Sequence, residues 1–238
     1  MKISAQNLDF RELNNYVRSA DSDICIDDCF GQRFIGSGAK DKKITINGTP
    51  GNALGAYLDG AVIEVNGNAQ DAVGDTMNSG KIIIHGNAGD ALGYAMRGGS
   101  IYVRGNAGYR TGIHMKQYKD KRPVIVIGGS AGSFLGEYLA GGLVIVLGIG
   151  SDGVPIGNFT GTGMHGGRIF IRTDKKITGF PAQVVAEIAS DEDLQEIMPH
   201  ISEFANLFGM NAGKFIMDRF YVLNPNAKNP YKQLYTPN

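Results

Sequence analysis

The side chains with which this sequence could do chemistry are two cysteines, four histidines and one regularly spaced pair of aspartates. Cys25 and Cys29 form a CxxxC pair, which supplies two ligands where a structural zinc ion or an iron–sulfur cluster usually needs four. The histidines fall at unrelated positions of the chain; they are His85, His114, His165 and His200. We therefore predict no metal site and interpret the cysteines as reduced thiols in a capping turn.

Asp71 and Asp90 lie 19 residues apart, which is the period of the repeat described below. Stacked about 4.8 Å apart, two carboxylates could share a proton and do the acid and base work of glycosidic bond cleavage. Asp is also common at turns, where its side chain hydrogen-bonds the local backbone. We interpret both residues as turn formers and predict no catalytic residue.

A GxGxxG pattern occurs at Gly161, Gly163 and Gly166. The dinucleotide-binding version of this pattern opens a helix whose N-terminus faces the pyrophosphate. Here the segment 168–172, Arg-Ile-Phe-Ile-Arg, follows and has the alternation of a strand. We therefore predict turn geometry at these glycines and no cofactor site on this chain.

Glycine recurs at a fixed spacing through the chain, each time just after a short run rich in Ile and Val. The spacings are 19, 19, 19, 24 and 19 residues, and the glycines are Gly48, Gly67, Gly86, Gly105, Gly129 and Gly148. Two apolar residues stand four and two positions before each, as Ile82 and Ile84 stand before Gly86. Because side chains alternate across a strand, each pair points to one side. The repeat predicts a solenoid whose stacked coils bury a continuous core.

A second glycine follows in each coil and marks a corner, since glycine reaches positive φ without steric cost. It comes seven residues after the first at Gly55, Gly74, Gly93, Gly112 and Gly136, and nine after at Gly157. The residue before it adds a second inward column, interrupted at Thr111, of Leu54, Val73, Leu92, Leu135 and Ile156. A polar column, predicted to form a hydrogen-bonded ladder along the axis, comprises Thr49, Asn68, Asn87, Asn106 and Ser130.

The chain divides into an N-terminal segment over residues 1–21, the repeat over 22–178, and a helical and extended tail over 179–238. In the tail, Ser190 and Asp193 resemble a capping box, and apolar residues then recur at helical spacing. Pro199 is expected to kink that helix or split it in two. A second short helix is expected near residues 212–219, and residues 224–238 are expected to be extended.

The outward strand positions are polar in the early coils and apolar in the late ones, where they are Val126, Ile145, Leu147 and Phe170. A strand that is apolar on both faces must be covered on both. The late coils are covered either by the tail of this chain or by a partner. We name these residues as a possible partner interface, together with the charged loop residues Lys119, Lys121 and Arg122.

Composition favours a neutral cytoplasmic protein. The 238 residues carry a formal net charge of zero, so nothing favours nucleic acid or an anionic membrane surface as a partner. The first residues contain no apolar signal-peptide core, and no run of about 18 apolar residues occurs. We expect no membrane association.

The combined motifs resemble the GXGXG β-helix family. The matching stretches are residues 86–89 with 98–99, 105–108 and 161–167; the resemblance covers roughly residues 22 to 175 and, more weakly, 190–196. The family includes the C-terminal domain of the glutamate synthase large (alpha) subunit, free-standing subunits of that type, N-methylglutamate synthase-type relatives and the β-helical C subunit of formylmethanofuran dehydrogenase. The resemblance implies an all-β, right-handed, single-stranded parallel β-helix of about seven coils of 19 residues.

The Gly-Met-His-Gly-Gly segment and the tail are most similar to a free-standing glutamate synthase subunit. The resemblance then implies a noncatalytic assembly subunit of a glutamate synthase-like oxidoreductase. Its implied partners are a glutamine amidotransferase subunit and a flavin and iron–sulfur synthase subunit, so FMN and iron–sulfur clusters would belong to other chains. Lys2 stands where an amidotransferase would carry its cysteine nucleophile, which agrees with a chain that has no active site.

Three alternatives stay open. The C subunit of a formylmethanofuran dehydrogenase-type complex would also be a noncatalytic scaffold and would differ in its partners. A stand-alone β-helix enzyme acting on a polysaccharide would need paired carboxylates such as Asp71 and Asp90. A homo-oligomeric scaffold would pair the apolar outer face of the late coils with itself. A hexapeptide acyltransferase fits less well, because its coils advance in steps of six residues.

Overall fold

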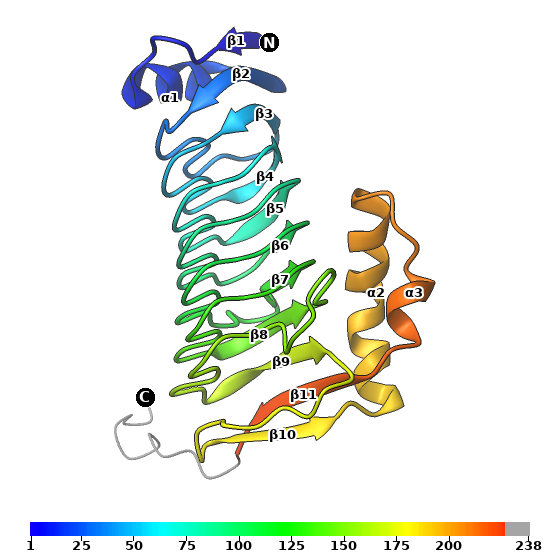
Figure 1. Cartoon of the computed structure of the whole chain (residues 1–238). Coiled ribbons are helices and arrows are strands. Elements are labelled where there is room, and N and C mark those ends of the chain that lie inside the picture. The colour runs from blue at the N-terminus through cyan, green and yellow to red at the C-terminus, as the bar shows by residue number, and fades with distance from the viewer. Residues whose placement is uncertain (227–238) are drawn as a thin grey trace, which may run out of the picture.

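The computed structural model describes residues 1–226, which form a parallel β-solenoid with two helices packed beside its late coils (Figure 1). The strands are β1 (Lys2–Ser4), β2 (Ile24–Phe30), β3 (Lys43–Thr49), β4 (Asp59–Asn66), β5 (Ser79–Ile84), β6 (Ser100–Val103), β7 (Val124–Ile127), β8 (Ala140–Val146), β9 (Gly166–Arg172), β10 (Val184–Ile188) and β11 (Phe220–Pro225). The helices are α1 (Phe10–Ser19), α2 (Asp191–Leu207) and α3 (Gly213–Ile216). The expected parallel solenoid with a helical tail is confirmed.

The sheet extends past both ends of the predicted repeat. Strands β1 to β9 stack in chain order, and β1 pairs in parallel with β2. At the other end β11 pairs antiparallel with β9, and β10 pairs antiparallel with β11. Helix α1, which the sequence patterns do not predict, begins at a capping box between Asp9 and Glu12. Residues 227–238 of the predicted extended stretch lie outside the described residues.

The core consists of stacked identical positions. The apolar pairs before the first glycines are fully buried, as at Ile82 and Ile84, and each pairs in register with its equivalent one coil away. The second inward column is equally buried at Leu54, Val73, Leu92 and Leu135. Thr111 is also fully buried there, and its hydroxyl donates to the Gly108 carbonyl at 3.3 Å. The hydroxyl is therefore accommodated without an unsatisfied polar group.

One assignment from the sequence is wrong: Gly157 is not the corner glycine of its coil. Its N–H donates to the Ala131 carbonyl at 3.0 Å, and Ile156 forms a bridge with Ala131. The corner of this coil is Gly161, with φ 75°, whose N–H donates to the Leu135 carbonyl. The enlarged coil displaces the corner by four residues, and Thr160 takes the inward position that sequence register gave to Ile156.

The predicted polar ladder forms at its three asparagines, and there each amide oxygen accepts from a backbone N–H rather than from another side chain. Asn68 Oδ1 accepts the N–H of Asn87, Asn87 Oδ1 accepts that of Asn106, and Asn106 Oδ1 accepts that of Ser130, each at 2.8 Å. Each side chain thus supplies a bond to the next coil outside the strands. Exposed turns are thereby held in the same register as the sheet.

Three of the first glycines, Gly86, Gly105 and Gly129, lie against this ladder and have no positive φ. A Cβ on Gly105 would overlap Asn87 Oδ1, and a Cβ on Gly86 would overlap Asn68 Oδ1. The amide oxygen therefore occupies the space in which a side chain would stand. The glycine and the asparagine one coil away act as one unit.

The outer face of the late coils is covered by this chain's own tail, with α2 lying beside those coils in Figure 1. Phe204, Ile197 and Ile201 of α2 form one buried cluster with the outward residues of β6 to β9. That cluster includes residues named above as a possible interface, which are fully buried: Val126, Ile145, Leu147 and Phe170. As an open partner surface, this part of the prediction is wrong.

Ion pairs fix α2 on the sheet. Arg168 of β9 pairs with both Asp193 and Glu196, and Arg122 pairs with Glu196 at 2.5 Å. One turn beyond Pro199, Glu203 pairs with Lys81 and accepts from the Tyr102 hydroxyl at 2.6 Å. The helix is continuous through Pro199, so it is not split in two.

Replacing Gly105 by Ala is expected to lower the free energy of unfolding by about 1–3 kcal/mol, because the new methyl group overlaps Asn87 Oδ1. Denaturant unfolding followed by circular dichroism measures it. The matched control is Gly153→Ala, since nothing lies within 4 Å of a Cβ there. Adding Asn87→Ala removes the nearest overlapping atom and leaves the Gly86 carbonyl oxygen 2.9 Å from the new Cβ. The double variant should therefore lose less unfolding free energy than the sum of the two single variants. Additive losses would contradict the coupling.

Because the Glu203 carboxylate joins α2 to the sheet, we expect the attachment of the tail to weaken in acid. Burial favours the neutral acid, but the hydrogen bonds from Lys81 and Tyr102 outweigh it and hold the pKa of Glu203 below its usual value. A depressed folded-state pKa stabilises the fold above the unfolded pKa, and this contribution disappears as pH falls through the folded value. Wild type should therefore exceed Glu203→Gln in stability at pH 7 by up to about 1 kcal/mol, and the difference should shrink at pH 3.

Unfolding curves at the two pH values give the measurement. Glu187→Gln, at an exposed position of β10, is the control. If the difference in unfolding free energy between wild type and Glu203→Gln stays constant with pH, the ion pair does not contribute to stability.

Candidate partner-docking edge

The cysteines and histidines lie apart on the solenoid. Cys29 is buried, its thiol lies 3.5 Å from Gln32 Oε1, and burial raises the pKa of that thiol to about 11. Cys25 lies half-buried on β2, where the Asn47 amide donates to its sulfur at 3.6 Å. Within residues 1–226, no three or more His, Cys, Asp or Glu side chains are grouped so that they could hold a metal ion.

Asp71 and Asp90 act as a second ladder. Asp71 Oδ1 accepts the N–H of Asp90 at 2.9 Å, and Asp90 Oδ1 accepts the N–H of Tyr109 at 2.8 Å. A Cβ on Gly89 or on Gly108 would overlap these carboxylate oxygens. Each carboxylate therefore bonds the next coil's backbone, as the turn interpretation expects.

The Gly161–Gly167 segment forms a corner and the start of a strand. Gly161 is the corner, Met164 is buried in the core, and Gly166 opens β9. His165 Nδ1 lies 3.1 Å from the Gly163 carbonyl. No helix follows the glycines, so the phosphate-binding arrangement is absent from this segment.

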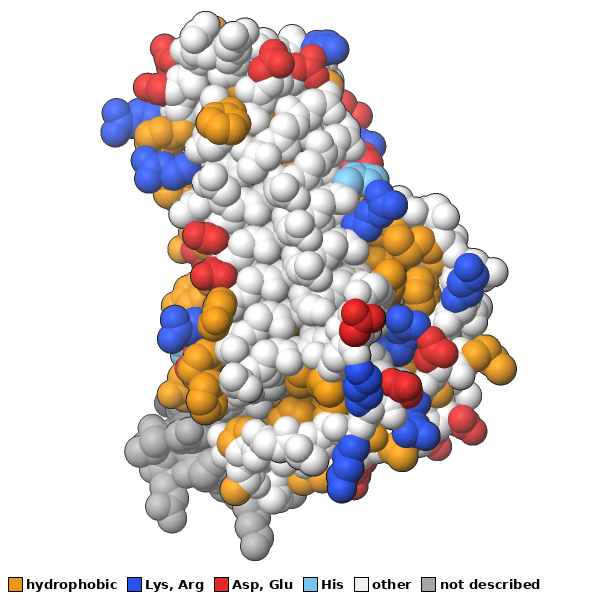
Figure 2. Space-filling model, in the orientation of Figure 1, with side chains coloured by type: hydrophobic (Ala, Val, Ile, Leu, Met, Phe, Trp, Pro, Cys, Tyr) orange, Lys and Arg blue, Asp and Glu red, His pale blue; other side chains and the backbone are white. Residues whose placement is uncertain are grey.

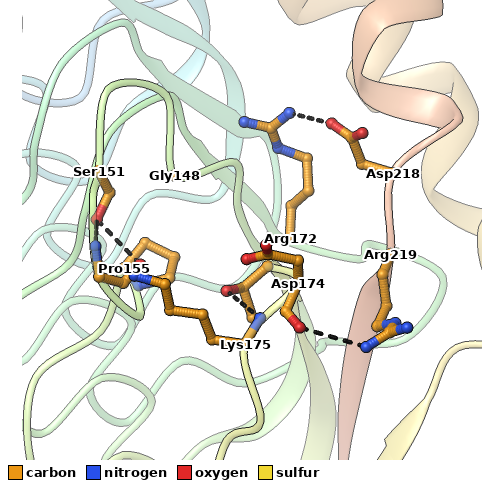
Figure 3. A pocket seen from close by; sticks show the side chains of 10 residues that line it. Gly148, Ser151, Pro155, Arg172, Asp174, Lys175, Asp218 and Arg219 are labelled. Atoms are coloured by element: carbon orange, nitrogen blue, oxygen red, sulfur yellow. Dashed lines mark hydrogen bonds and ion pairs between the residues drawn. The ribbon is translucent and has the colours of Figure 1, made fainter.

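A pocket of about 270 Å³ opens beside the enlarged coil after Gly148, where Arg172 of β9 faces Asp218 of the tail (Figure 3). Arg172 pairs with Asp218 at 2.5 Å, and Arg219 donates to the Asp174 carbonyl at 3.3 Å. Neither histidine nor cysteine lines the pocket. Its charged groups join the tail to the end of the solenoid and offer no nucleophile with a base.

Aromatic rings, all of them exposed except the half-buried Phe134, line the corner edge of the late coils. Figure 2 shows hydrophobic side chains gathered along the edge away from α2. We call this group the aromatic edge. His114 stacks on Tyr138 with centroids 5.1 Å apart, and Phe134 stacks on Phe159 at 5.0 Å. The Arg110 guanidinium lies 5.4 Å from the Phe134 centroid. Its members are Tyr94, Tyr109, His114, Phe134, Tyr138 and Phe159.

Four of these rings stand at strained backbone positions. His114, Phe134, Tyr138 and Phe159 have φ between 52° and 61°, a region that costs a non-glycine residue about 1–2 kcal/mol. They occupy the positions two residues before or after the corner glycines. Other coils place Ala91 or Gly163 at equivalent positions, so the fold does not need an aromatic ring there. Aromatic rings gathered on a surface are typical of a site that contacts another molecule.

The charged loop after Gly112 contributes to two surfaces. Arg122 pairs with Glu196 and so serves the attachment of α2. Lys119 and Lys121 are exposed, and the Lys119 ammonium lies 5.4 Å from the Tyr118 centroid. Of the predicted interface residues, these two lysines are therefore the ones that the structure leaves open to a partner.

The sequence profile of the GXGXG motif family matches residues 6–229. The chain belongs to the GXGXG family. It is 42% identical over 252 residues to the protein "Uncharacterized protein MJ1350" of Methanocaldococcus jannaschii, covering 99% of this chain and 96% of that one.

Among solved structures, this GXGXG chain is similar to one in the formyltransferase/hydrolase complex FhcABCD of Methylorubrum extorquens, determined in complex with methylofuran. The TM-score is 0.62 at 20% identity, over 85% of this chain and 73% of the other. At that identity the similarity shows the shared fold.

Sequence reasoning missed the aromatic edge, although a signal was present. Phe134 and Phe159 each stand two residues before a corner glycine, Gly136 and Gly161. Taking Gly157 as the corner hid the second of these. In the part of the GXGXG chain that the structure describes, no helix is long and apolar enough to cross a membrane.

Phe159→Gly should leave the free energy of unfolding within about 1 kcal/mol of wild type. Relief of the left-handed conformation offsets the lost stacking on Phe134, and Phe159 is 60% exposed. Phe204→Ala, in the buried cluster under α2, should by contrast cost about 3–5 kcal/mol. Thermal and denaturant unfolding compare the two variants. A loss at Phe159 as large as that at Phe204 would make the edge a folding element rather than a docking surface.

Proposed function

We propose that this GXGXG protein is a noncatalytic assembly subunit of a multi-subunit enzyme complex, and that the aromatic edge docks a partner subunit. The observation that carries the proposal is a row of four rings at positive φ where other coils carry small residues. Three of these rings are exposed, His114, Tyr138 and Phe159, and Phe134 is half-buried. The groups with catalytic potential are already engaged in structural bonds, including both aspartates of the second ladder. The aromatic edge therefore supports a scaffold role, in which it binds a partner subunit.

A complex of the formylmethanofuran dehydrogenase type is the partner set that the similarities favour. The related fold in FhcABCD is part of a formyltransferase/hydrolase complex, and this chain covers 73% of that related chain. Under this proposal the formyl chemistry resides on other polypeptides. This was the alternative to the glutamate synthase interpretation in the sequence analysis.

A glutamate synthase-like complex is the second candidate. Its support is the Gly-Met-His-Gly-Gly segment and a tail helix that begins at the predicted capping box of Ser190 and Asp193. In that case a glutamine amidotransferase and a flavin and iron–sulfur synthase would be the partners, and those chains would hold FMN and the clusters. The scaffold role of this chain would be unchanged.

Affinity purification from the native source at endogenous expression tests the proposal. We expect stoichiometric partner subunits, identified by mass spectrometry as formyl-transferring and hydrolytic enzymes or as an amidotransferase with a flavoprotein. The double variant Phe159→Gly, Tyr138→Gly should retain its fold and lose most of the partner, while Phe30→Ala, at a ring that is 89% exposed on β2, should retain it. A wild-type protein that purifies alone would refute the assembly role. A self-associated one would favour the homo-oligomeric scaffold.

A further inference from the structure

A second aromatic surface lies at the other end of the same edge, where α1 packs beside the first coils. Phe10, Phe34 and Tyr57 line a groove of about 430 Å³, with Arg11 and Arg18 at its border. We call this the N-terminal groove. Phe34 is 44% exposed and Tyr57 58% exposed. The groove therefore presents aromatic walls beside cationic side chains.

The arginines of this region are unpaired. Within residues 1–226, none of Arg11, Arg18 and Arg33 lies within ion-pair distance of a carboxylate. Arg11 and Arg33 lie over the Phe10 ring at 5.4 and 5.1 Å from its centroid, and Arg18 donates to Asn15 Oδ1 at 2.6 Å.

The carboxylates nearby are occupied. Glu12 accepts the N–H of Asp9 within the capping box at 3.0 Å. Asp75, the acidic residue that lines the groove, accepts from the Thr76 hydroxyl at 2.8 Å. Among the residues that line the groove, Arg11 and Arg18 are cationic and Asp75 is anionic, so the lining carries one net positive charge in a chain whose formal charge is zero.

The groove is built in advance of any ligand. The buried Asn14 side chain donates to the carbonyls of Phe10 and Arg33 at 2.6 and 2.9 Å, which ties α1 to the first coil. At the other end of the helix, the Lys42 ammonium donates to the carbonyls of Val17 and Ala20. A preformed site lowers the ordering cost of binding.

The two groove rings carry the same backbone strain as the aromatic edge. Phe34 and Tyr57 have φ of 60° and 57°, while Ala53 and Thr76 occupy the equivalent positions one coil later. Coil geometry accepts small residues at both positions. Phe34 also contacts the Phe10 ring of α1, with centroids 6.1 Å apart, whereas Tyr57 is 58% exposed and has no ring contact among the described residues. Aromatic residues and arginine are the types most enriched where interfaces derive their binding energy.

We propose that the N-terminal groove binds an extended acidic segment of a partner subunit. A carboxylate of that segment pairs with Arg11 or Arg18, and an adjacent apolar side chain lies against Phe34 and Tyr57. Arginine forms bidentate bonds with carboxylates, which gives the contact orientation as well as charge complementarity. The inference rests on the proposed function, because a partner chain supplies the segment.

Site-specific photo-crosslinking in the assembled complex tests the groove. Tyr57→p-benzoylphenylalanine is introduced into the tagged full-length chain, the complex is isolated from its native source and irradiated, and the linked peptide is sequenced. We expect one peptide from a partner subunit, with Asp or Glu within about three residues of the linked position, the reach of neighbouring side chains along an extended segment. Arg11→Glu with Arg18→Glu should lower the cross-link yield about tenfold or more.

Arg97→Glu is the control for the charge change, because Arg97 is exposed outside the groove and has no ion pair among the described residues. Thermal unfolding of the Arg11, Arg18 double variant verifies that α1 remains folded. The groove proposal is overturned, with the assembly role intact, if partners co-purify but Tyr57 links to none, links to a second copy, or links to a segment without acid. If no partner co-purifies, the assembly role itself fails and the groove proposal fails with it.

Discussion

The solenoid depends on a bond between a side chain and the next coil's backbone. An Asn or Asp oxygen accepts an N–H one coil further along, and the residue before that N–H is glycine because the oxygen fills the space of its side chain. Strand pairing alone would leave the turn amides of each coil without a partner in the protein, and polar backbone groups close to a core are costly when unpaired. The two ladders keep the turns of neighbouring coils in the same register as the strands. Neither asparagine nor glycine is replaceable independently.

At the late coils the stacked strands also have an apolar outer face, and the tail covers it. Strands β7 to β9 are apolar on both faces, so the outer face needs cover as well as the inner one. Helix α2 supplies an apolar stripe, and its acidic residues meet Arg168, Arg122 and Lys81 at the margins. Because these ion pairs are half-exposed, the apolar contact supplies most of the attachment and the charges fix its register.

Much of the fold could be predicted because one period dictates both core and turns. The apolar pairs, the ladder column and the capping box at Ser190 all follow from local patterns. Errors arose where the period was interrupted: the enlarged coil moved the corner from Gly157 to Gly161. The cover over Ile145 and Phe170 depends on contacts between the strands and a helix that lies far along the chain. The pattern alone could therefore favour the tail only slightly over a partner. Helix α1 was missed because its signal is a capping box with a short apolar stripe, outside the repeat.

Function on such a solenoid is confined to positions that the coil geometry leaves free. The core requires apolar residues in the inward columns, and the next coil's amide requires an acceptor in the ladder columns. The positive φ at each corner requires glycine. The two columns that flank each corner tolerate Ala, Gly, Thr, His, Tyr, Phe and Arg at nearly the same backbone angles. The chain places large rings there at both ends of one edge, although small residues hold the same φ in the coils between them. Gathered aromatic rings are typical of surfaces that contact another molecule. Small and acidic residues such as Asp71 and Ala72 separate the two aromatic groups, so one long edge presents two distinct contact surfaces.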